Sequence, residues 1–372
     1  MSQRLPIPFI AGLWLAGALV TLWMVWNGLG QNQLSTDKDY ANLWVAGRLA
    51  LDGNIPAIFD VEAFRQASVP LLGERIAGNY SYPPHALFLA VPFAALPYEW
   101  SLVAWTLVGM AFFMWAAREH CHKVMPLFLV VLTPAALDNI RFGHYGFFAG
   151  GLFLLAFSNR SRIAGLAAAA LTIKPHLGLM VAVQMLLHRR ALVIAIAGTV
   201  ALVIASLLAF GPSAWTGFLT ETFSYQSGLI APGSRGKLVH MMPTPLVGYG
   251  LVGHLSFATC AVLLLSRCFN VFTAATATFL ILPYAFHYDM TVANLGFAIL
   301  IFTRWDEMRL LEKLAACLGF LVPEFTTFGT WFAPPLLLAG LYVQTRQLEG
   351  RELVNWRSGK VPPRDGEVAA GG

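Results

Sequence analysis

The sequence predicts an all-α, polytopic membrane protein. Three observations lead to this fold class: the composition, the length of the apolar runs, and the placement of the basic residues between them. Apolar residues make up 57% of the 372 residues and charged residues only 12%, and the mean hydropathy is +0.64. Soluble proteins carry roughly 25% charged residues. Most of the chain is therefore expected to lie in lipid.

The apolar runs set the expected number of spans. A bilayer core about 30 Å thick needs about 20 helical residues, and fewer where the bundle shelters a short or broken helix. The first run is too long for a signal peptide and no A-x-A-like site follows it, so we interpret it as an uncleaved span. We expect one domain over residues 1–344 with about twelve transmembrane helices, at residues 8–29, 100–117, 124–137, 145–158, 163–173, 177–187, 191–210, 244–265, 269–286, 290–303, 311–323 and 328–343.

The positions of the basic residues predict the orientation of these spans and indicate whether residues 163–187 form one helix or two. The runs 163–173 and 177–187 could be two helices or one helix interrupted at Lys174-Pro175. Lys and Arg in short loops collect on the cytoplasmic side. Two helices, with the N-terminus inside, place nearly all short basic loops in the cytoplasm, whereas one merged helix divides them between the two faces. The hairpin is thus favoured, with these residues cytoplasmic: Arg118, Lys123, Arg160, Arg162, Arg189, Arg190, Arg267, Arg304 and Arg309.

This topology leaves two large external segments, at about 30–99 and 211–243. The apolar run 85–96 lies between Pro83-Pro84 and Pro97 and is too short to cross. A crossing there would also invert the charge asymmetry, so we expect a juxtamembrane helix at the outer surface. Residues 345–372 are basic and end in Gly and Ala, which is typical of a cytoplasmic, partly disordered tail. Both termini are then cytoplasmic, in a cell (inner) membrane.

Several kinds of site are not supported. The net charge is +5, but the basic residues are scattered singly and in pairs and form no stripe that could follow a nucleic acid. The four cysteines, Cys121, Cys260, Cys268 and Cys317, form no C-x-x-C pair, which argues against disulfides and zinc. The His120-Cys121-His122 segment is interpreted as a solvated turn.

Polar residues collect at the expected outer ends of the helices, and ionisable groups in such places are functional candidates. A carboxylate facing water suits removal of a proton from a hydroxyl, and cations at the lipid boundary suit a phosphate. Simpler interpretations exist: Asp37 and Asp39 as helix caps, Arg48 as their partner, and Lys174 as a lysine at a helix end. We expect one external polar cavity among Asp37, Asp39, Arg48, Tyr80, Tyr82, His85, Asp138, Arg141, His144, Lys174, His176, Arg235, Lys237, His240, His287, Tyr288 and Asp289.

An ordered set of motifs resembles glycosyltransferase family 87, within the GT-C superfamily. The set runs from about residue 36 to 290, and its order and spacing carry the resemblance. It consists of Asp39-Tyr40 with Trp44 and Ala46-Gly47, then Asp52-Gly53, Phe59-Asp60, Tyr82-Pro83-Pro84, Lys174-Pro175, Phe210-Gly211-Pro212-Ser213-Ala214-Trp215 and His287-Tyr288-Asp289. Family members often carry Gly-Gln where this sequence has Gly143-His144, so no role of that glutamine transfers.

The resemblance implies an inverting transfer from a polyprenyl-phosphate sugar to a hydroxyl of a glycolipid or polysaccharide, on the external face. One acid serves as general base, because the phosphate leaves as an anion. Asp39 holds the motif position of this base, with Asp37 second. The donor phosphate is expected at Lys174, His176, Arg48, Arg235 and Lys237, and further substrate contacts at Tyr82, His85, Arg141, His144, His287 and Asp289.

Other aspects stay open at the sequence level. The sugar could be mannose-like or arabinofuranose-like, so the enzyme could be a hexosyl- or pentosyltransferase. No cofactor is expected, and the Asp-x-Asp spacing of Asp37 and Asp39 is weak evidence for a metal. The oligomeric state is undetermined. The competing hypotheses are a flippase or transporter for a lipid-linked sugar and an inactive membrane scaffold of the same fold.

Overall fold

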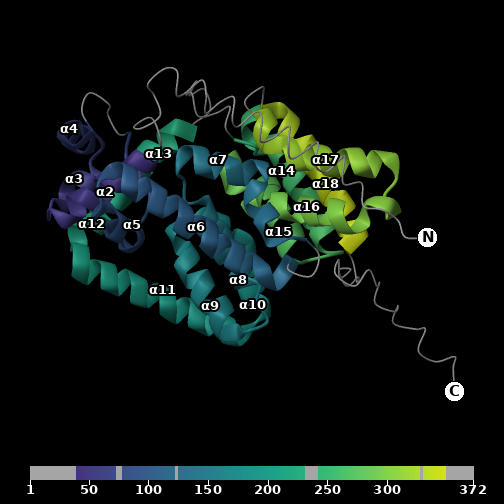
Figure 1. The fold of residues 1–372 in the computed structure, drawn as a ribbon, viewed down its shortest axis with the longest axis horizontal. Coiled ribbons are helices and arrows are strands. Elements are labelled where there is room, and N and C mark those ends of the chain that lie inside the picture. Colours follow the sequence, from purple (N-terminus) through teal and green to yellow (C-terminus); the bar gives the residue numbers. More distant parts are fainter. Residues whose placement is uncertain (1–38, 73–77, 122–124, 231–241, 327–329, 349–372) are drawn as a thin grey trace.

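A computed structural model describes residues 39–72, 78–121, 125–230, 242–326 and 330–348, and within these ranges every regular element is helical (Figure 1). The expected first span at 8–29 lies outside the described residues, as do Asp37, Arg235, Lys237 and His240. The all-α fold class is therefore confirmed for the described residues.

The helices fall into three successive groups along the chain. The first group is α2 (Tyr40–Leu51), α3 (Ile55–Phe59), α4 (Val61–Leu72), η1 (Pro84–Ala86) and α5 (Leu87–Ala94). The second is α6 (Tyr98–Cys121), η2 (Leu127–Leu132), α7 (Pro134–Phe142), α8 (Gly146–Ala156), α9 (Ser161–Ala170), η3 (Leu171–Ile173), η4 (Pro175–Gly178), α10 (Leu179–Leu187) and α11 (Arg189–Phe210). The third is α12 (Pro212–Gly217), η5 (Phe218–Thr222), α13 (Phe223–Ile230), α14 (Pro245–Leu265), α15 (Val271–Ile281), η7 (His287–Asp289), α16 (Thr291–Arg304), η8 (Trp305–Glu307), α17 (Leu310–Phe325), η10 (Thr330–Phe332) and α18 (Ala333–Leu348).

Three of the described helices are long and apolar enough to cross a bilayer, namely α6, α11 and α14. The other expected spans that fall within the described residues correspond to shorter or interrupted helices. The run 124–137 is not one helix, because η2 ends before Thr133-Pro134 and α7 begins at Pro134. The run 269–286 is helical only through Ile281, since the backbone becomes extended at Leu282 before Pro283. Proline disfavours the helical conformation of the residue before it, which accounts for both interruptions.

The sequence predicts that the transmembrane domain ends at residue 344. Helix α18 continues through Leu348, and Gln344, Thr345 and Gln347 are buried within it. Arg346, expected in the tail, forms an ion pair with Glu312 of α17. The contact between α17 and α18 thus extends the folded domain past residue 344.

The motif around Trp44 fixes α2 against α5. The indole Nε1 of Trp44 donates a hydrogen bond to the carbonyl oxygen of Leu96 at 3.0 Å. A Cβ on Gly47 would lie 2.5 Å from the Cβ of Ala94, so only glycine permits this approach. Helix α5, expected as a juxtamembrane helix, therefore packs closely on α2 and sets the position of its first residues.

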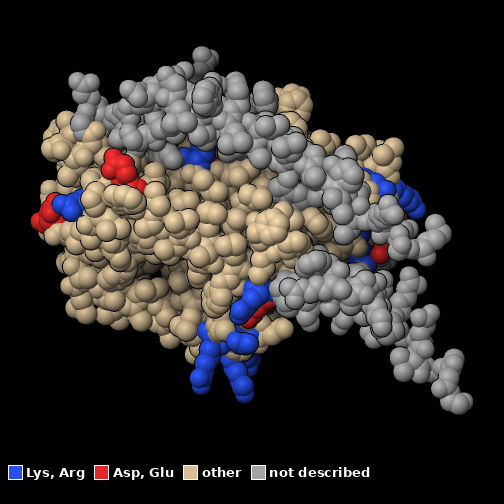
Figure 2. Space-filling model, viewed as in Figure 1, with Lys and Arg blue, Asp and Glu red and all other residues tan. Residues whose placement is uncertain are grey.

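The helical backbone is interrupted at Lys174-Pro175, between α9 and α10, as the hairpin interpretation requires. Four arginines line one hollow where α9 begins and α10 leads into α11: Arg160, Arg162, Arg189 and Arg190. Figure 2 shows basic side chains gathered at the lower edge of the molecule, near the ends of α9 to α11 in Figure 1. Lys174 lies beyond the other end of α9 and η3, about 20 Å away at the rise of a helix.

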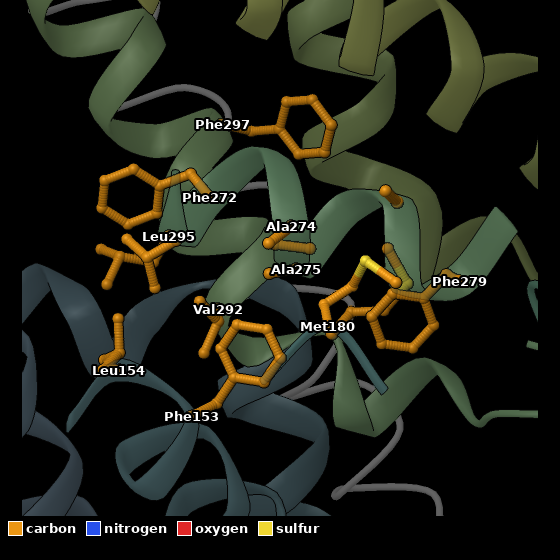
Figure 3. Close-up of a cluster of buried hydrophobic side chains, with 14 of the residues drawn as sticks. Phe153, Leu154, Met180, Phe272, Ala274, Ala275, Phe279, Val292, Leu295 and Phe297 are labelled. Atoms are coloured by element: carbon orange, nitrogen blue, oxygen red, sulfur yellow. The ribbon is translucent and has the colours of Figure 1, made fainter. Parts of the chain in front are cut away.

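Two clusters of buried apolar side chains form the core. One lies among α2 to α6 and α8, and the other joins α6 to α11 with α14 to α18. Figure 3 shows part of the second cluster, where Phe153, Met180, Phe279 and Val292 come together from α8, α10, α15 and α16. Phe112 and Leu152 pack against both clusters. The two clusters therefore form one continuous packed region beside the candidate site.

Candidate active site

A cavity of about 260 Å³ opens where the first helices meet the segments after α9, α12 and α15. Its lining combines one carboxylate, one lysine, two histidines, amides, hydroxyls and aromatic rings. The residues are Asp39, Asn42, Asn79, Ser81, Tyr82, Pro83, His144, Ile173, Lys174, Pro175, His176, Phe218, Thr222, Phe223, Tyr284, Phe286 and Tyr288. From the set expected to form the cavity, the structure thus brings together Asp39, Tyr82, His144, Lys174, His176 and Tyr288.

Asp39 stands at the N-cap position of α2, yet its side chain makes no capping hydrogen bond. Its Oδ2 lies 2.7 Å from Nε2 of His144, and its side chain remains 48% exposed. The helix-cap interpretation therefore does not account for this carboxylate. Instead, one oxygen faces a buried imidazole and the side chain opens into the cavity.

Gly143 brings His144 to this position. It ends α7 in the left-handed conformation, with φ of 71°, and a Cβ there would lie 2.6 Å from the Cβ of Tyr40. Glycine adopts this conformation without steric cost. Trp105 then donates a hydrogen bond from Nε1 to the carbonyl oxygen of His144 at 3.3 Å. The backbone beside Asp39 is therefore fixed from α2 and from α6.

The ring of His144 is also held by stacking. Its centroid lies 3.4 Å from that of Tyr288, and the two planes are 13° apart. Tyr288 in turn stacks on Phe286 with a centroid distance of 5.2 Å. The imidazole therefore lies between a carboxylate and an aromatic stack, and both limit its rotation.

The charges around Asp39 favour its ionised form. Partial burial raises the pKa of the Asp39 carboxyl, but His144, together with the charges of Lys174 and His287, more than offsets this effect. The pKa of Asp39 consequently lies below its ordinary value. Asp39 is a carboxylate at neutral pH and can accept a proton.

Lys174 supplies a buried cation next to this carboxylate. Its Nζ donates to Oδ1 of Asp289 at 2.6 Å, and the side chains are 3% and 0% exposed. The same Nζ lies 5.0 Å from the ring centroid of Tyr288 and 5.7 Å from that of Tyr82. An ammonium has three N–H donors and Asp289 uses one. Lys174 can therefore bind a further anion at the cavity.

His176 lines the cavity as a neutral group. Burial lowers the pKa of His176 to about 4, opposed in part by Asp289 and assisted by Lys174. Its ring lies 5.0 Å from the ring of Tyr284. Burial also raises the pKa of the Tyr82 hydroxyl well above its ordinary value, and Asp289 and Asp39 add to this shift. Both side chains can offer hydrogen bonds to a substrate, but neither brings a charge.

Five of the residues expected to contact the donor phosphate or another part of the substrate lie outside the cavity lining. Arg48 is in the last turn of α2, at the opposite end from Asp39. His85 is buried against Thr172, with Nε2 3.1 Å from Oγ1. His287 lies 3.0 Å from Asp138, Nε2 to Oδ2. Arg141 lies over the ring of Phe142. Asp289 contacts the cavity only through Lys174.

Other cavity residues were not expected from the sequence. Asn42 lies one turn after Asp39 and accepts a hydrogen bond through Oδ1 from the amide of Gly78 at 2.7 Å. Phe218 and Thr222 belong to η5, a π-helical turn. Such turns are rare and often occur at functional sites. Neither the position of Asn42 nor the π-helical turn could be predicted from the sequence, because polar and aromatic residues are common in a large external segment.

No group of three or more His, Cys, Asp or Glu side chains within the described ranges is placed to hold a metal ion. Asp37, the second acid of the Asp-x-Asp spacing, is outside those ranges. The geometry described here is therefore that of a carboxylate–imidazole pair facing a lysine–carboxylate pair.

Fold and site together define a helical membrane protein with a carboxylate–imidazole pair and a buried lysine at one cavity. The chain belongs to glycosyltransferase family 87, whose family model matches residues 80–323, about two thirds of its length. It is therefore a membrane glycosyltransferase. The comparisons with curated proteins and with solved structures found no match. The family match includes His144, Lys174 and Tyr288 and begins after Asp39.

Proposed function

We propose that the protein transfers a sugar from a polyprenyl-phosphate donor to a hydroxyl of a glycolipid or polysaccharide, with inversion at the anomeric carbon. The observation that carries this proposal is the single cavity in which the Asp39–His144 pair faces Lys174. The sugar is a hexose such as a mannose-like unit or a pentose such as an arabinofuranose-like unit. No metal takes part in the reaction proposed here.

Asp39 acts as the general base. In the transfer, the acceptor hydroxyl forms a bond to the anomeric carbon, its proton passes to Asp39, and the bond from that carbon to the phosphate oxygen breaks. His144 contacts one carboxylate oxygen and leaves the exposed part of the side chain for the acceptor. A base that is already ionised and fixed in place needs no reorganisation when the hydroxyl arrives.

Lys174 stabilises the leaving group. The departing polyprenyl phosphate gains negative charge as the bond breaks, and a fixed cation in a site with little water stabilises that charge strongly. Asp289 holds Lys174 in place. A phosphate needs no proton to leave, which explains why one acid beside the acceptor is sufficient.

The arginine hollow supports an external site. Arg160, Arg162, Arg189 and Arg190 lie at one end of α9 to α11 and the cavity lies beyond the other. Arginines in short loops favour the cytoplasmic side. The cavity is then on the external side of an inner membrane, with both chain termini in the cytoplasm.

The test is transfer by the purified protein in lipid nanodiscs, supplied with a panel of polyprenyl-phosphate sugars and a lipid extract of the source membrane. Products are identified by mass. Asp39→Asn is expected to lower the transfer rate at least about a hundredfold, the lower range for loss of a general base. Asp52→Asn is the matched control, because Asp52 is an exposed acid at the other end of α2.

The outcomes separate the possibilities. Transfer by wild type and Asp52→Asn but not by Asp39→Asn supports the mechanism. Wild-type turnover by Asp39→Asn removes Asp39 as the base. Movement of the sugar lipid across the bilayer without any new glycosidic bond would instead indicate a transporter.

A further inference from the structure

A hollow of about 780 Å³ lies at the end of α9 opposite to Lys174. Its lining includes four arginines and no acidic residue: Arg160, Arg162, Arg189 and Arg190. All four arginines are exposed, and Figure 2 shows basic side chains projecting from this edge of the molecule. We call this site the arginine hollow. It shares no lining residue with the candidate active site.

Close packing of α9 on α11 brings the four arginines together. A Cβ on Gly165 would lie 2.7 Å from the Cβ of Ile194. A Cβ on Gly198 would lie 2.8 Å from the Cβ of Ala169. Each contact joins a residue of α9 to the residue of α11 that follows it by 29 positions. The two helices are therefore parallel and in one register, which brings the arginines at the start of α11 level with those at the start of α9.

The guanidinium groups of the arginine hollow have no anionic partner among the described residues. No ion pair or side-chain hydrogen bond joins any of the four to another described residue. Glu119 reaches this end of α9, but its Oε2 accepts a hydrogen bond from Oγ of Ser158 at 2.9 Å. Arg304, in contrast, pairs with Glu307 at 3.0 Å. Four positive charges thus share one hollow without a neutralising carboxylate.

The positions of these charges are unfavourable for the two helices. Neither α9 nor α11 has an acidic residue in its first turn, and neither has a capping side-chain hydrogen bond. A helix N-terminus carries a partial positive charge, so cations there reduce stability. The preference of basic loops for the cytoplasm explains on which side the arginines lie. It does not require two loops to face one hollow, whereas an anion bound among the arginines would offset the repulsion.

An apolar wall adjoins the arginines and indicates the kind of anion. Ile163, Val193 and Ile194 complete the lining of the hollow on the side of the bilayer. Val193 and Ile204 lie on one face of α11 and are 66% and 51% exposed, with the exposed Ala197 between them. This face extends about 16 Å from Val193 to Ile204, about half the thickness of a bilayer core. Hydrocarbon chains attached to an anion in the hollow could lie along it.

We propose that the arginine hollow binds the head group of an anionic phospholipid in the leaflet opposite the cavity. In the orientation proposed above, this is the cytoplasmic leaflet. The arginine pairs of α9 and α11 hold the phosphate from two sides, since guanidinium groups match two phosphate oxygens at once. Basic pockets between transmembrane helices are suited to such head groups. The site is independent of the donor, the sugar and the general base.

Binding of single lipid molecules tests this proposal without any transfer reaction. The full-length protein in neutral detergent is titrated with dioleoyl phosphatidylglycerol, and the bound lipids are counted by native mass spectrometry. Dioleoyl phosphatidylcholine is the zwitterionic comparison. We expect one phosphatidylglycerol molecule to bind at least about tenfold more tightly than phosphatidylcholine, because the choline cation is repelled by the arginines that bind the phosphate.

Two double variants remove the arginine pairs separately. They are Arg160→Gln/Arg162→Gln on α9 and Arg189→Gln/Arg190→Gln on α11. Each is expected to weaken the binding of phosphatidylglycerol about thirtyfold, through the loss of two cations near an anionic head group. Because the phosphate lies between the two pairs, the loss should be similar in both variants.

The matched control is Arg267→Gln/Lys313→Gln, which removes two positive charges that do not line the hollow. It should change the affinity less than about threefold, because salt screens distant charges. Arg189→Lys/Arg190→Lys keeps the charges that orient the helices. Since lysine lacks the planar fork of arginine, this variant should weaken binding about tenfold. It supplies the measurement if the glutamine variants fail to insert.

Thermal unfolding distinguishes a binding role from a structural one. Without phosphatidylglycerol, both glutamine variants of the hollow should have the Tm of wild type or a slightly higher one, because like charges at two helix N-termini are removed. Added phosphatidylglycerol should raise the Tm of wild type and of the control, but not that of the two variants. A lower Tm of both variants without lipid would show a structural role and overturn the inference.

The remaining outcomes also decide the proposal. Equal affinity for the two lipids, or an equal loss in Arg267→Gln/Lys313→Gln and in the hollow variants, overturns it. A loss in only one of the hollow variants shows that the two pairs do not share one phosphate and overturns it as well. Displacement of phosphatidylglycerol by excess inorganic phosphate would indicate a site for free phosphate and not for a lipid. None of these results depends on sugar transfer, so the proposed function can fail or succeed separately.

Discussion

His144 contacts the carboxylate of Asp39 at 2.7 Å, although 105 positions separate the two residues in the chain. The pair links the start of α2 to the segment after α7, and Tyr288 supports it from the far side of the imidazole. The resembling family often carries glutamine where His144 stands. In this chain the same place holds an imidazole, which lowers the pKa of Asp39.

His144→Gln is therefore expected to change the pH dependence of transfer. Burial raises the pKa of Asp39 and His144 is the first of the groups that lower it. Loss of His144 leaves burial less opposed, so the pKa of Asp39 rises. A general base works only when ionised, and transfer is lost as pH falls through its pKa. The acid limb of kcat/KM should thus move to higher pH in His144→Gln. An acid limb at the same pH in both proteins would contradict this role.

Gly143→Ala should weaken transfer through geometry. A Cβ at this position would lie 2.6 Å from the Cβ of Tyr40 in a left-handed backbone, and the backbone strain alone costs about 1–2 kcal/mol. The segment must shift, and His144 shifts with it. We expect the acid limb to move as in His144→Gln, together with a lower kcat, measured in the same pH series.

Gly53→Ala is the control for this change. Gly53 has φ of +74°, but a Cβ there meets nothing within 4 Å. It carries the backbone strain without the clash and lies far along α2 from Asp39. A loss of thermal stability with an unchanged pH profile is expected for Gly53→Ala. Similar pH profiles for both variants would show that the position of His144 is not set by Gly143.

The Lys174–Asp289 pair should show separate effects on stability and on transfer. Lys174→Met leaves the fully buried Asp289 carboxylate without its cation, and breaking such a pair costs about 3–5 kcal/mol. The double variant Lys174→Met/Asp289→Asn removes both charges and should recover most of the thermal stability. Its kcat/KM should stay about a hundredfold or more below wild type, because the cation at the leaving phosphate is missing.

Thermal unfolding in nanodiscs and transfer from the polyprenyl donor are measured on the same preparations. A stable double variant with wild-type kcat/KM would remove Lys174 from the mechanism. An unstable double variant would show that the hydrogen bond between Lys174 and Asp289, and not only the balance of their charges, stabilises the segment between α9 and α10. In that case Lys174→Arg, which keeps the charge, serves as the second variant for the transfer measurement.

His176→Gln should have little effect on the pH profile. Burial lowers the pKa of His176 to about 4, so the imidazole is uncharged from about pH 5 upward. In the proposed mechanism His176 offers the donor a hydrogen bond, which glutamine can replace. The pH profile of kcat/KM should keep its shape between pH 5 and 8. A new limb near neutral pH in wild type that disappears in His176→Gln would contradict a neutral His176.

The sequence predicted the parts of the site that stand out against lipid. Lys174 beside a proline, and Asp39 just beyond an apolar run, are conspicuous because charge is costly in a membrane. The contacts between site residues were harder to predict from the sequence. Asp289 was expected to contact substrate, but it neutralises Lys174 across 115 positions, and His85 turns inward to Thr172. Such pairings depend on how helices pack, which hydropathy does not contain.

The prediction of helix boundaries from the sequence was limited in a similar way. Runs such as 124–137 and 269–286 contain no charged residue, so hydropathy joins segments that Pro134 and Pro283 divide. The π-helical turn at Phe218–Thr222 has no sequence signature at all. Arg48 was grouped with Asp39 because both lie in the first external segment, whereas α2 places them at its opposite ends.

The exposure of Asp39 and Lys174 differs sharply, at 48% and 3% of their side chains. In the proposed reaction the proton is released where bulk solvent can carry it away. The phosphate charge grows where solvent is scarce and a single fixed cation governs its energy. The proposed reaction thus spans two surroundings of different dielectric constant, with the bond being exchanged at their boundary. An acceptor hydroxyl that approaches from the aqueous side and a donor sugar that is tethered in lipid can therefore meet at this boundary.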